Sequence, residues 1–261
     1  MKNFLLLTGI FLFVSGYTIA QKNDTITIKP SDINTNALKP GMHRWLVYFK
    51  MGKDSSRTRY QVWSRKIDLI QYQGKDAISV TQEWENNDTI IHTVYTVCDR
   101  KDFSTLYQSA WSKTAGKAEF DFLSKQMKLD GKISDASDTL TANKRRRLAF
   151  EQALIQYNLN WHLDLEVFPL LPYKNNSTFA INFYDPGFPA PKLVYYSVTG
   201  SVTLTGYDGQ SIDCWTLEHN DADRGKNHEV FYISKKTKEV LQLEQEFSGR
   251  YRYKVKLPFS N

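Results

Sequence analysis

The chain has 261 residues, with 34 Lys and Arg against 28 Asp and Glu and a formal net charge of +6 at pH 7. This length suffices for one large antiparallel β domain or two small ones, and no apolar run beyond the first twenty residues approaches the ~20 residues that a transmembrane helix needs. Most cations alternate with acidic or apolar residues, as on the solvated face of a strand, so the charge does not predict nucleic-acid binding.

The first twenty residues have the pattern of an export signal. A short positive start precedes a predominantly apolar run from Phe4, and Thr18 and Ala20 occupy the −3 and −1 positions of a signal-peptidase site. Because Gln21 and not Cys follows the predicted cut, we expect a cleaved signal peptide over residues 1–20 and no lipid anchor. The predicted location is the periplasm of a Gram-negative envelope, or outside the cell.

Strand signals begin at His43, after a polar, proline-punctuated stretch over residues 21–42 that we expect to form a flexible leader. The runs that follow are rich in Tyr, Trp, Val, Ile and Thr and are separated by Gly, Asn, Asp and Lys at turn-like spacing, which is typical of consecutive β-strands. They cover residues 44–50, 57–71, 76–84, 89–98 and 103–109.

One helix is predicted to interrupt the strands near residues 143–158. Phe150, Ala153, Leu154 and Tyr157 fall on one face at helical spacing, and we expect Asn143 to cap the first turn. A long curved sheet needs an element on its concave side. We expect this helix to fill that position.

The clearest strand pattern follows a breaker segment at residues 185–191. From Val194 to Thr205, apolar and hydroxylated residues alternate, which indicates an antiparallel sheet that faces water on one side. Gly200 falls in the apolar row and predicts a bend. Further strand runs cover residues 211–218, 229–234, 239–247 and 251–257.

Together these elements predict an all-β dominated fold. We expect a single large curved antiparallel sheet, a half-barrel, over residues 43–261, with the one inserted helix near its centre.

Aromatic residues crowd the stretch that follows the predicted helix. Pockets for small molecules are lined mainly by such side chains, so these residues are the candidate ligand-binding set. The alternative is that they form hydrophobic core between the sheet and the helix. They are Trp161, Phe168, Phe179, Phe183, Tyr184 and Phe188.

The densest group of potential metal ligands comprises His219, Asp221, Asp223 and His228. Zinc and manganese accept imidazole and carboxylate donors, and calcium prefers carboxylates. The same run is also an ordinary polar hairpin tip, and it lacks the spacing of an EF-hand. We therefore predict no metal and no cofactor, and keep these four residues as weak candidates.

His162, Asp164 and Glu166 alternate with apolar residues, and we interpret them as the wet face of a strand. The motifs GxSxG, P-loop and HExxH are absent, so we assign no catalytic residue and predict a protein that is not an enzyme. A disulfide between Cys98 and Cys214 stays open, because their spacing does not indicate proximity.

Three segments carry a resemblance to known proteins: residues 183–188 (FYDPGF), 230–241 (VFYISKKTKEVL) and 251–254 (YRYK). With the export signal and the curved sheet, they make the chain resemble the LolA/LolB-like carriers of Gram-negative periplasms. The likeness is closer to a group of uncharacterised secreted proteins that share that half-barrel. The resemblance implies binding of an acyl chain or another hydrophobe and brings no catalytic residues.

We accordingly expect a soluble periplasmic binding or carrier module for a lipid-like, amphiphilic ligand. The alternative is a structural or protein-interaction component of the cell envelope with a packed interior, and a third reading is a hydrolase of envelope lipid or glycan. The expected partners are a lipid or amphiphile, an anionic membrane surface or an envelope protein, and not nucleic acid. The sequence does not predict an oligomeric state.

Overall fold

The structure is a computed structural model that describes residues 24–221 and 227–258. The predicted signal peptide over residues 1–20 lies outside this range. No helix in the described ranges is long and apolar enough to cross a membrane.

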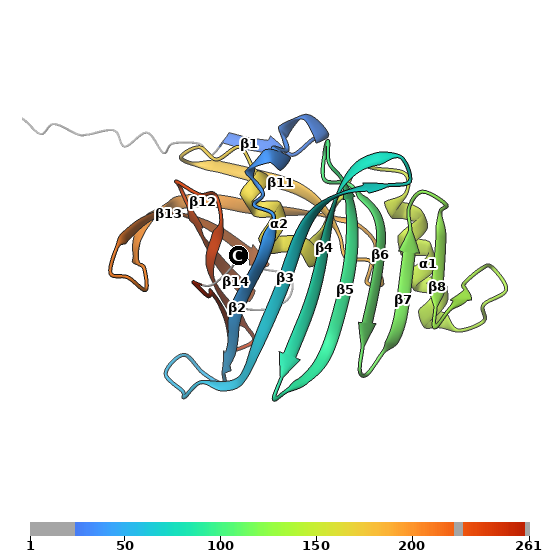
Figure 1. The fold of residues 1–261 in the computed structure, drawn as a ribbon, viewed down its shortest axis with the longest axis horizontal. Coiled ribbons are helices and arrows are strands. Elements are labelled where there is room, and N and C mark those ends of the chain that lie inside the picture. Colours follow the sequence, from blue (N-terminus) through green and yellow to red (C-terminus); the bar gives the residue numbers. More distant parts are fainter. Residues whose placement is uncertain (1–23, 222–226, 259–261) are drawn as a thin grey trace, which may run out of the picture.

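Most of the described residues belong to one mixed, mostly antiparallel sheet, in which the structure places sixteen strands (Figure 1). Its first half contains β1 (Asp24–Thr27), β2 (Gly41–Lys50), β3 (Thr58–Tyr72), β4 (Lys75–Asn86), β5 (Thr89–Asp99), β6 (Thr105–Ser112), β7 (Gly116–Asp121), β8 (Gln126–Leu129) and β9 (Lys132–Ile133). The second half contains β10 (Leu159–Asn160), β11 (Ser177–Tyr184), β12 (Lys192–Thr205), β13 (Ser211–Asp221), β14 (Asn227–Ser234), β15 (Val240–Phe247) and β16 (Arg250–Lys256).

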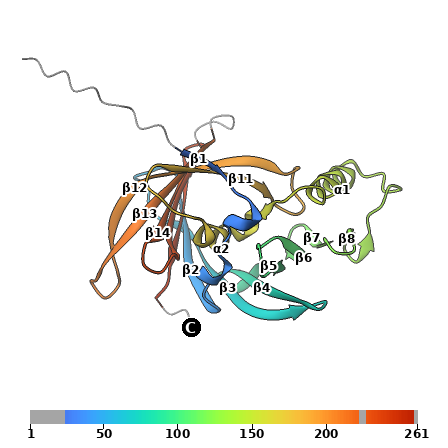
Figure 2. The ribbon, with the colours of Figure 1, turned by 90° about the horizontal axis from the view of Figure 1, so that it is seen from above.

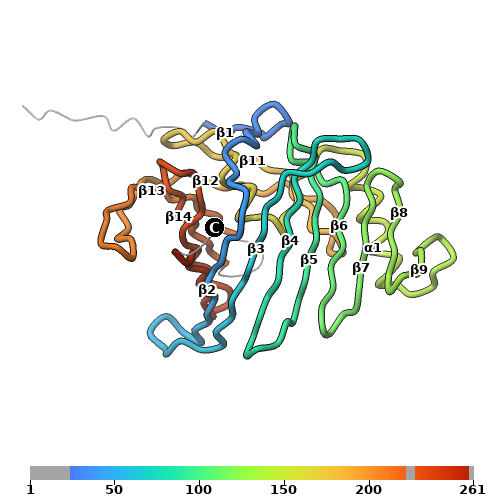
Figure 3. Tube along the Cα trace, viewed as in Figure 1, coloured from blue at the N-terminus to red at the C-terminus, as the bar shows by residue number. Residues whose placement is uncertain are grey.

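The strand order brings the two halves together through the C-terminal strand. β11 to β16 follow in sequence, β16 then pairs with β2, and β2 to β9 complete the sheet. β1 pairs in parallel with β11 at one end, so the N-terminal segment lies beside a strand from the middle of the chain (Figure 3). The sheet curls but does not close (Figure 2). The predicted half-barrel is therefore confirmed.

The helices are short and lie on the inner and open sides of the sheet. They are η1 (Pro30–Asp32), η2 (Thr35–Ala37), α1 (Thr141–Ala153), η3 (Trp161–Leu163), α2 (Asp164–Val167) and η4 (Phe168–Leu170). The predicted helix is α1, but its N-cap residue is Leu140 and not Asn143. The Asn143 amide instead donates to Asp138 Oδ2 at 2.9 Å.

The position expected for α1 was wrong. The sheet curls around α2, while α1 lies at the open side (Figure 2). There Phe150 and its neighbours pack on Phe120 of β7, Met127 of β8 and Tyr184 of β11, so α1 joins the two ends of the sheet. The concave interior is filled by η3, α2 and η4, whose Leu163, Val167, Phe168 and Leu170 belong to the main core.

β12 confirms the period-2 reading. Val194, Tyr196 and Val198 are buried, whereas Tyr195 and Thr199 are exposed. The pairing with β13 shifts register between Val198 and Gly200, which is the bend that Gly200 predicted.

The leader differs from its expectation. Residues 24–40 run along the sheet through β1, η1 and η2, and Ile28 and Ile33 are buried in the main core. Apolar side chains in a polar stretch provide the contact that orders it. Cys98 and Cys214 are both free and buried.

Candidate functional site

β16 carries its charges on the inner face of the sheet. Lys254 is opposite Val47 and Lys256 is opposite Trp45, and both partners are buried in the core. The outer face of β16 holds the tyrosines, and Tyr253 stacks on Tyr48 with ring centroids 4.9 Å apart. Because residues alternate between faces along a strand, Arg252 must also face inward.

Two acids of α2 pair with Lys254 and with Arg65 of β3. Lys254 Nζ lies 2.6 Å from Asp164 Oδ2, and Arg65 reaches both Asp164 Oδ1 at 3.3 Å and Glu166 Oε2 at 2.5 Å. Arg65 and Glu166 are each 1% exposed. Burial lowers the pKa of Lys254 to about 8 even though Asp164 favours the charged form. These pairs hold α2 against the sheet.

The polar character continues across the neighbouring strands. Arg252 of β16 is opposite Gln245 of β15, Gln245 is opposite Glu229 of β14, and Glu229 is opposite His219 of β13. Opposite residues share a face, so these four side chains form one row inside the curved sheet. Burial raises the pKa of Glu229 to about 7, against the opposing effect of Arg252.

Three residues of this row, Glu229, Gln245 and Arg252, form the base of a pocket of about 290 Å³, which we call the polar pocket. Its walls come from η3 and α2, from β11, and from the loop between β11 and β12. The lining residues are Trp161, Asp164, Phe183, Asp185, Phe188, Pro189, Ala190, Lys192, Glu229, Gln245 and Arg252.

A chain of contacts runs beside the polar pocket. His92 Nε2 lies 3.2 Å from His162 Nε2, and His162 Nδ1 lies 3.5 Å from Asp185 Oδ1. Trp84 stacks on His162 with nearly parallel rings. Burial and the neighbouring His162 lower the pKa of His92 to about 4, so His92 would be a weak general base near neutral pH.

A second, larger cavity of about 870 Å³ lies between α1 and the inner face of β6 to β8, and we call it the α1 groove. Ala110, Ala118 and Leu129 line it from the sheet, and Leu148 lines it from α1. The loop residues Phe188, Pro189 and Ala190 separate the groove from the polar pocket, because they line both cavities.

The four consecutive basic residues of α1, at positions 144–147, have different surroundings. Arg147 pairs with Glu151 at 2.6 Å, whereas Arg145 and Arg146 line the α1 groove. Asp130 is an acid in the same lining, and its Oδ1 accepts a hydrogen bond from the Lys117 backbone. The groove is thus lined mostly by apolar residues, and its charged lining residues are Arg145, Arg146, Lys117 and Asp130.

The predicted aromatic residues include both core and pocket-lining residues, and Phe183 is both. Phe168, Phe179 and Phe183 are buried in the main core and Tyr184 in the cluster under α1. Trp161 and Phe183 line the polar pocket, while Phe188, 60% exposed, lines both the polar pocket and the α1 groove. Core and pocket are therefore both represented in this set.

The weak metal candidates do not converge. His219 belongs to the inward-facing row opposite Glu229, whereas His228 is opposite Asn220 and lies on the other face of the sheet, 3.2 Å from Glu218. Asp221 forms an ion pair with Lys192 at 3.7 Å, and Asp223 lies outside the described residues. Among described residues, no three His, Cys, Asp or Glu side chains are placed to hold a metal ion.

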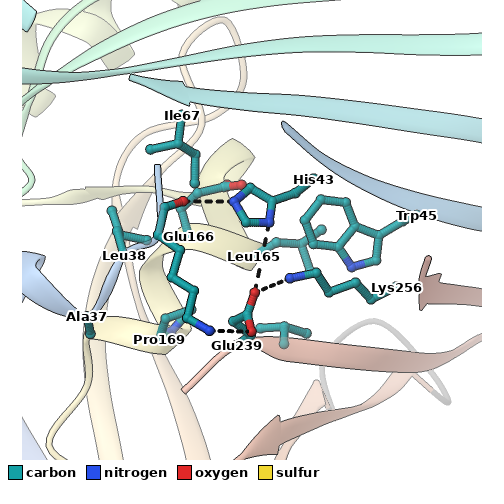
Figure 4. Close-up of a pocket in the computed structure, with 12 residues that line it drawn as sticks. Ala37, Leu38, His43, Trp45, Ile67, Leu165, Glu166, Pro169, Glu239 and Lys256 are labelled. Atoms are coloured by element: carbon teal, nitrogen blue, oxygen red, sulfur yellow. Dashed lines mark hydrogen bonds and ion pairs between the residues drawn. The ribbon is translucent and has the colours of Figure 1, made fainter. Parts of the chain in front are cut away.

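A third cavity lies under η2 and measures about 20 Å³, too small for a ligand larger than water (Figure 4). Glu239 is its centre: Lys39 Nζ lies 3.0 Å and His43 Nδ1 3.9 Å from the carboxylate, and Lys256 donates a hydrogen bond to it. This cluster joins the leader to β2 and β16.

The sequence indicated neither the polar row nor the α1 groove. One feature of the sequence could have indicated the row. On β14, β15 and β16 its residues stand two positions from others that the register places inside: Glu229 from Phe231, Gln245 from Leu243, and Arg252 from Lys254. Recognising this feature requires the pairing of the strands, which the sequence did not supply.

The family model described as a protein of unknown function, DUF3108, matches residues 44–256. The chain therefore belongs to the DUF3108 family. No curated protein matches it. A DUF1329 family protein from Desulfovibrio piger is similar at 12% identity and a TM-score of 0.31, over 85% of this chain and 86% of that chain. A β-barrel-like DUF1849 protein from Brucella abortus is similar at 8% identity and a TM-score of 0.33, over 84% and 97%.

Proposed function

We propose that this DUF3108 protein is a non-catalytic binding or carrier module for an amphiphile with an anionic headgroup, and that the α1 groove is its ligand site. One observation carries the proposal: an apolar cavity of about 870 Å³ has two arginines on one wall. Cavities of about 300–1,000 Å³ with mostly apolar walls and a few placed polar groups are typical of small-molecule sites.

In this proposal the hydrocarbon chain lies against Ala110, Ala118 and Leu129, and the headgroup meets Arg145 and Arg146. Each methylene that leaves water contributes about 0.8 kcal/mol. A chain of about ten methylenes then offsets much of the roughly 4–15 kcal/mol that association costs.

The resemblance to LolA/LolB-like carriers supports the same class of ligand. The proposed site differs from the expected one in its location. Because the segment from Trp161 to Leu170 occupies the concave interior, the proposed ligand binds at the open side of the sheet, under α1. The predicted export signal would place this function in the periplasm or outside the cell.

A series of alkyl carboxylates of eight, ten and twelve carbons tests the proposal by displacement of a fluorescent fatty acid. We expect affinity to rise about fourfold per methylene, as about 0.8 kcal/mol each requires. An affinity that does not depend on chain length, or no displacement by any member, would contradict it.

Variants locate the site. Leu148→Glu places a charge in the α1 groove and should weaken decanoate binding at least tenfold. Ile155→Glu is the matched control, because Ile155 is exposed just beyond α1 and does not line the groove. Arg145→Gln should weaken binding of decanoate more than Lys144→Gln does. Equal effects of the two variants would show that Arg145 does not bind the headgroup.

A further inference from the structure

The polar pocket differs from the α1 groove in chemistry and in construction. Its base is formed by Arg252, Gln245 and Glu229, which are opposite one another on three adjacent strands. Neighbouring strands lie about 4.8 Å apart, so the backbones of Arg252 and Glu229 are about 10 Å apart, with Gln245 between them. The sheet therefore fixes a cation and an anion at a set separation.

Two polar atoms of this row are buried without a hydrogen-bond partner in the described part of the chain. They are Gln245 Oε1 and Arg252 Nε, an acceptor and a donor. Leaving such groups unpaired is unfavourable, so the pocket favours a ligand that offers both a donor and an acceptor.

The charged residues of the polar pocket differ in whether a side chain outside the pocket pairs with them. Asp164 and Lys192 each form an ion pair with a side chain that does not line the pocket, and Asp185 Oδ1 lies 3.5 Å from His162 Nδ1, which is also outside the lining. Arg252 and Glu229 are the other two charged residues of the lining. They offer one positive and one negative position to a ligand.

The remaining wall is aromatic. Trp161 stacks on Phe183 with ring centroids 5.5 Å apart, and Phe188 lines the pocket from the loop after β11. An apolar group of the ligand can pack on these rings while its charged end reaches the polar row.

We propose that the polar pocket binds a small zwitterion of the amino-acid class, with its carboxylate on Arg252, its ammonium on Glu229 and an apolar side chain against Trp161 and Phe188. This site is separate from the proposed amphiphile site, and neither proposal depends on the other.

Titration calorimetry with L-phenylalanine, L-leucine and L-methionine tests the proposal on the full chain. We expect saturable binding of at least one of them. Arg252→Gln and Glu229→Gln should each weaken it about tenfold to a hundredfold, the range for a hydrogen bond to a charged group. The matched controls Arg250→Gln and Glu244→Gln remove the same charges from neighbouring positions outside the pocket and should change affinity less than twofold.

Ligand analogues assign each charge without relying on the variants alone. N-acetyl-L-phenylalanine lacks the ammonium, so it should bind weakly, and Glu229→Gln should not weaken it further. L-phenylalaninamide lacks the carboxylate and should be insensitive to Arg252→Gln in the same way.

Three results would overturn the proposal: no saturable binding of the three amino acids, analogues that bind as tightly as L-phenylalanine, or binding of N-acetylglucosamine in their place. Decanoate binding should be unchanged in Arg252→Gln and Glu229→Gln. If no amino acid binds the polar pocket, the proposal for the α1 groove therefore still stands. If decanoate does not bind the α1 groove, the proposal for the polar pocket still stands.

Discussion

Burial opposes the ionisation of Glu229. Its carboxylate faces Arg252 and Lys254 from β16, Asp164 from α2, Lys192 from β12 and His219 from β13. The two effects of burial and neighbouring charge do not cancel, and burial keeps the pKa at about 7, above the ordinary value of 4.5. The folded protein therefore loses stability as the pH rises from about 4.5 through about 7.

The substitution Glu229→Gln removes this titration while keeping the shape of the side chain. At pH 8.5 we expect the variant to be more stable than the wild type by about 2 kcal/mol, because the buried charge is gone. At pH 5 the carboxyl group is largely protonated in the folded protein, so the difference should be much smaller.

Urea unfolding at both pH values measures this effect, with Glu244→Gln as the control for a carboxylate on the outer face. A Glu229→Gln protein that is less stable than the wild type at pH 8.5 would show that Arg252 stabilises the carboxylate by more than burial penalises it.

Among single residues, the buried charged ones could not be predicted from the sequence. The alternation of Arg and Lys with Tyr and Val over residues 250–256 favours the aromatic side as the inner one. Lys254 faces inward instead, because Asp164 lies 2.6 Å from its ammonium group. Partners that are 90 positions apart in the chain leave no local pattern.

At the scale of elements, alternation predicted β12 correctly and failed for the segment from Trp161 to Leu170. β12 has one buried and one exposed face, which period 2 describes directly. In α2 and η4 both the apolar residues and Glu166 are buried, and the two acids Asp164 and Glu166 are paired with Lys254 and Arg65. A segment buried on all sides gives no amphipathic period from which to tell helix from strand.

The leader and β16 are held together by Glu239. Burial opposes its ionisation, but Lys256 and Lys39 outweigh burial and lower the pKa of Glu239 to about 2. The stabilisation is therefore present above the ordinary pKa of 4.5 and is lost as the pH falls toward 2.

We expect Glu239→Gln to cost about 1–2 kcal/mol at pH 7, since the group is partly exposed and solvent screens the pairs. The loss should shrink between pH 4.5 and pH 2.5, and limited proteolysis should cut residues 24–40 faster in the variant at pH 7. Equal stability and equal cleavage of variant and wild type at pH 7 would contradict the role assigned to this cluster.

At the scale of the whole molecule, the sequence predicted one curved antiparallel sheet and the existence of a helix in the middle of the chain. It did not predict how the curl is completed. Tyr184 of β11 and Phe120 of β7 belong to one hydrophobic cluster, together with Phe150 and Ala153 of α1. That cluster joins opposite ends of a sheet of sixteen strands, and it also creates the α1 groove.

The central claim is that an amphiphile occupies the space under α1. Amide hydrogen exchange with and without decanoate tests it most directly, because it reports which segments a ligand protects. We predict slower exchange in residues 116–121 and 141–153, which form β7 and α1, and no change in residues 211–221 of β13. Protection of β13 without protection of α1, or no protected segment at a saturating decanoate concentration, would contradict the account.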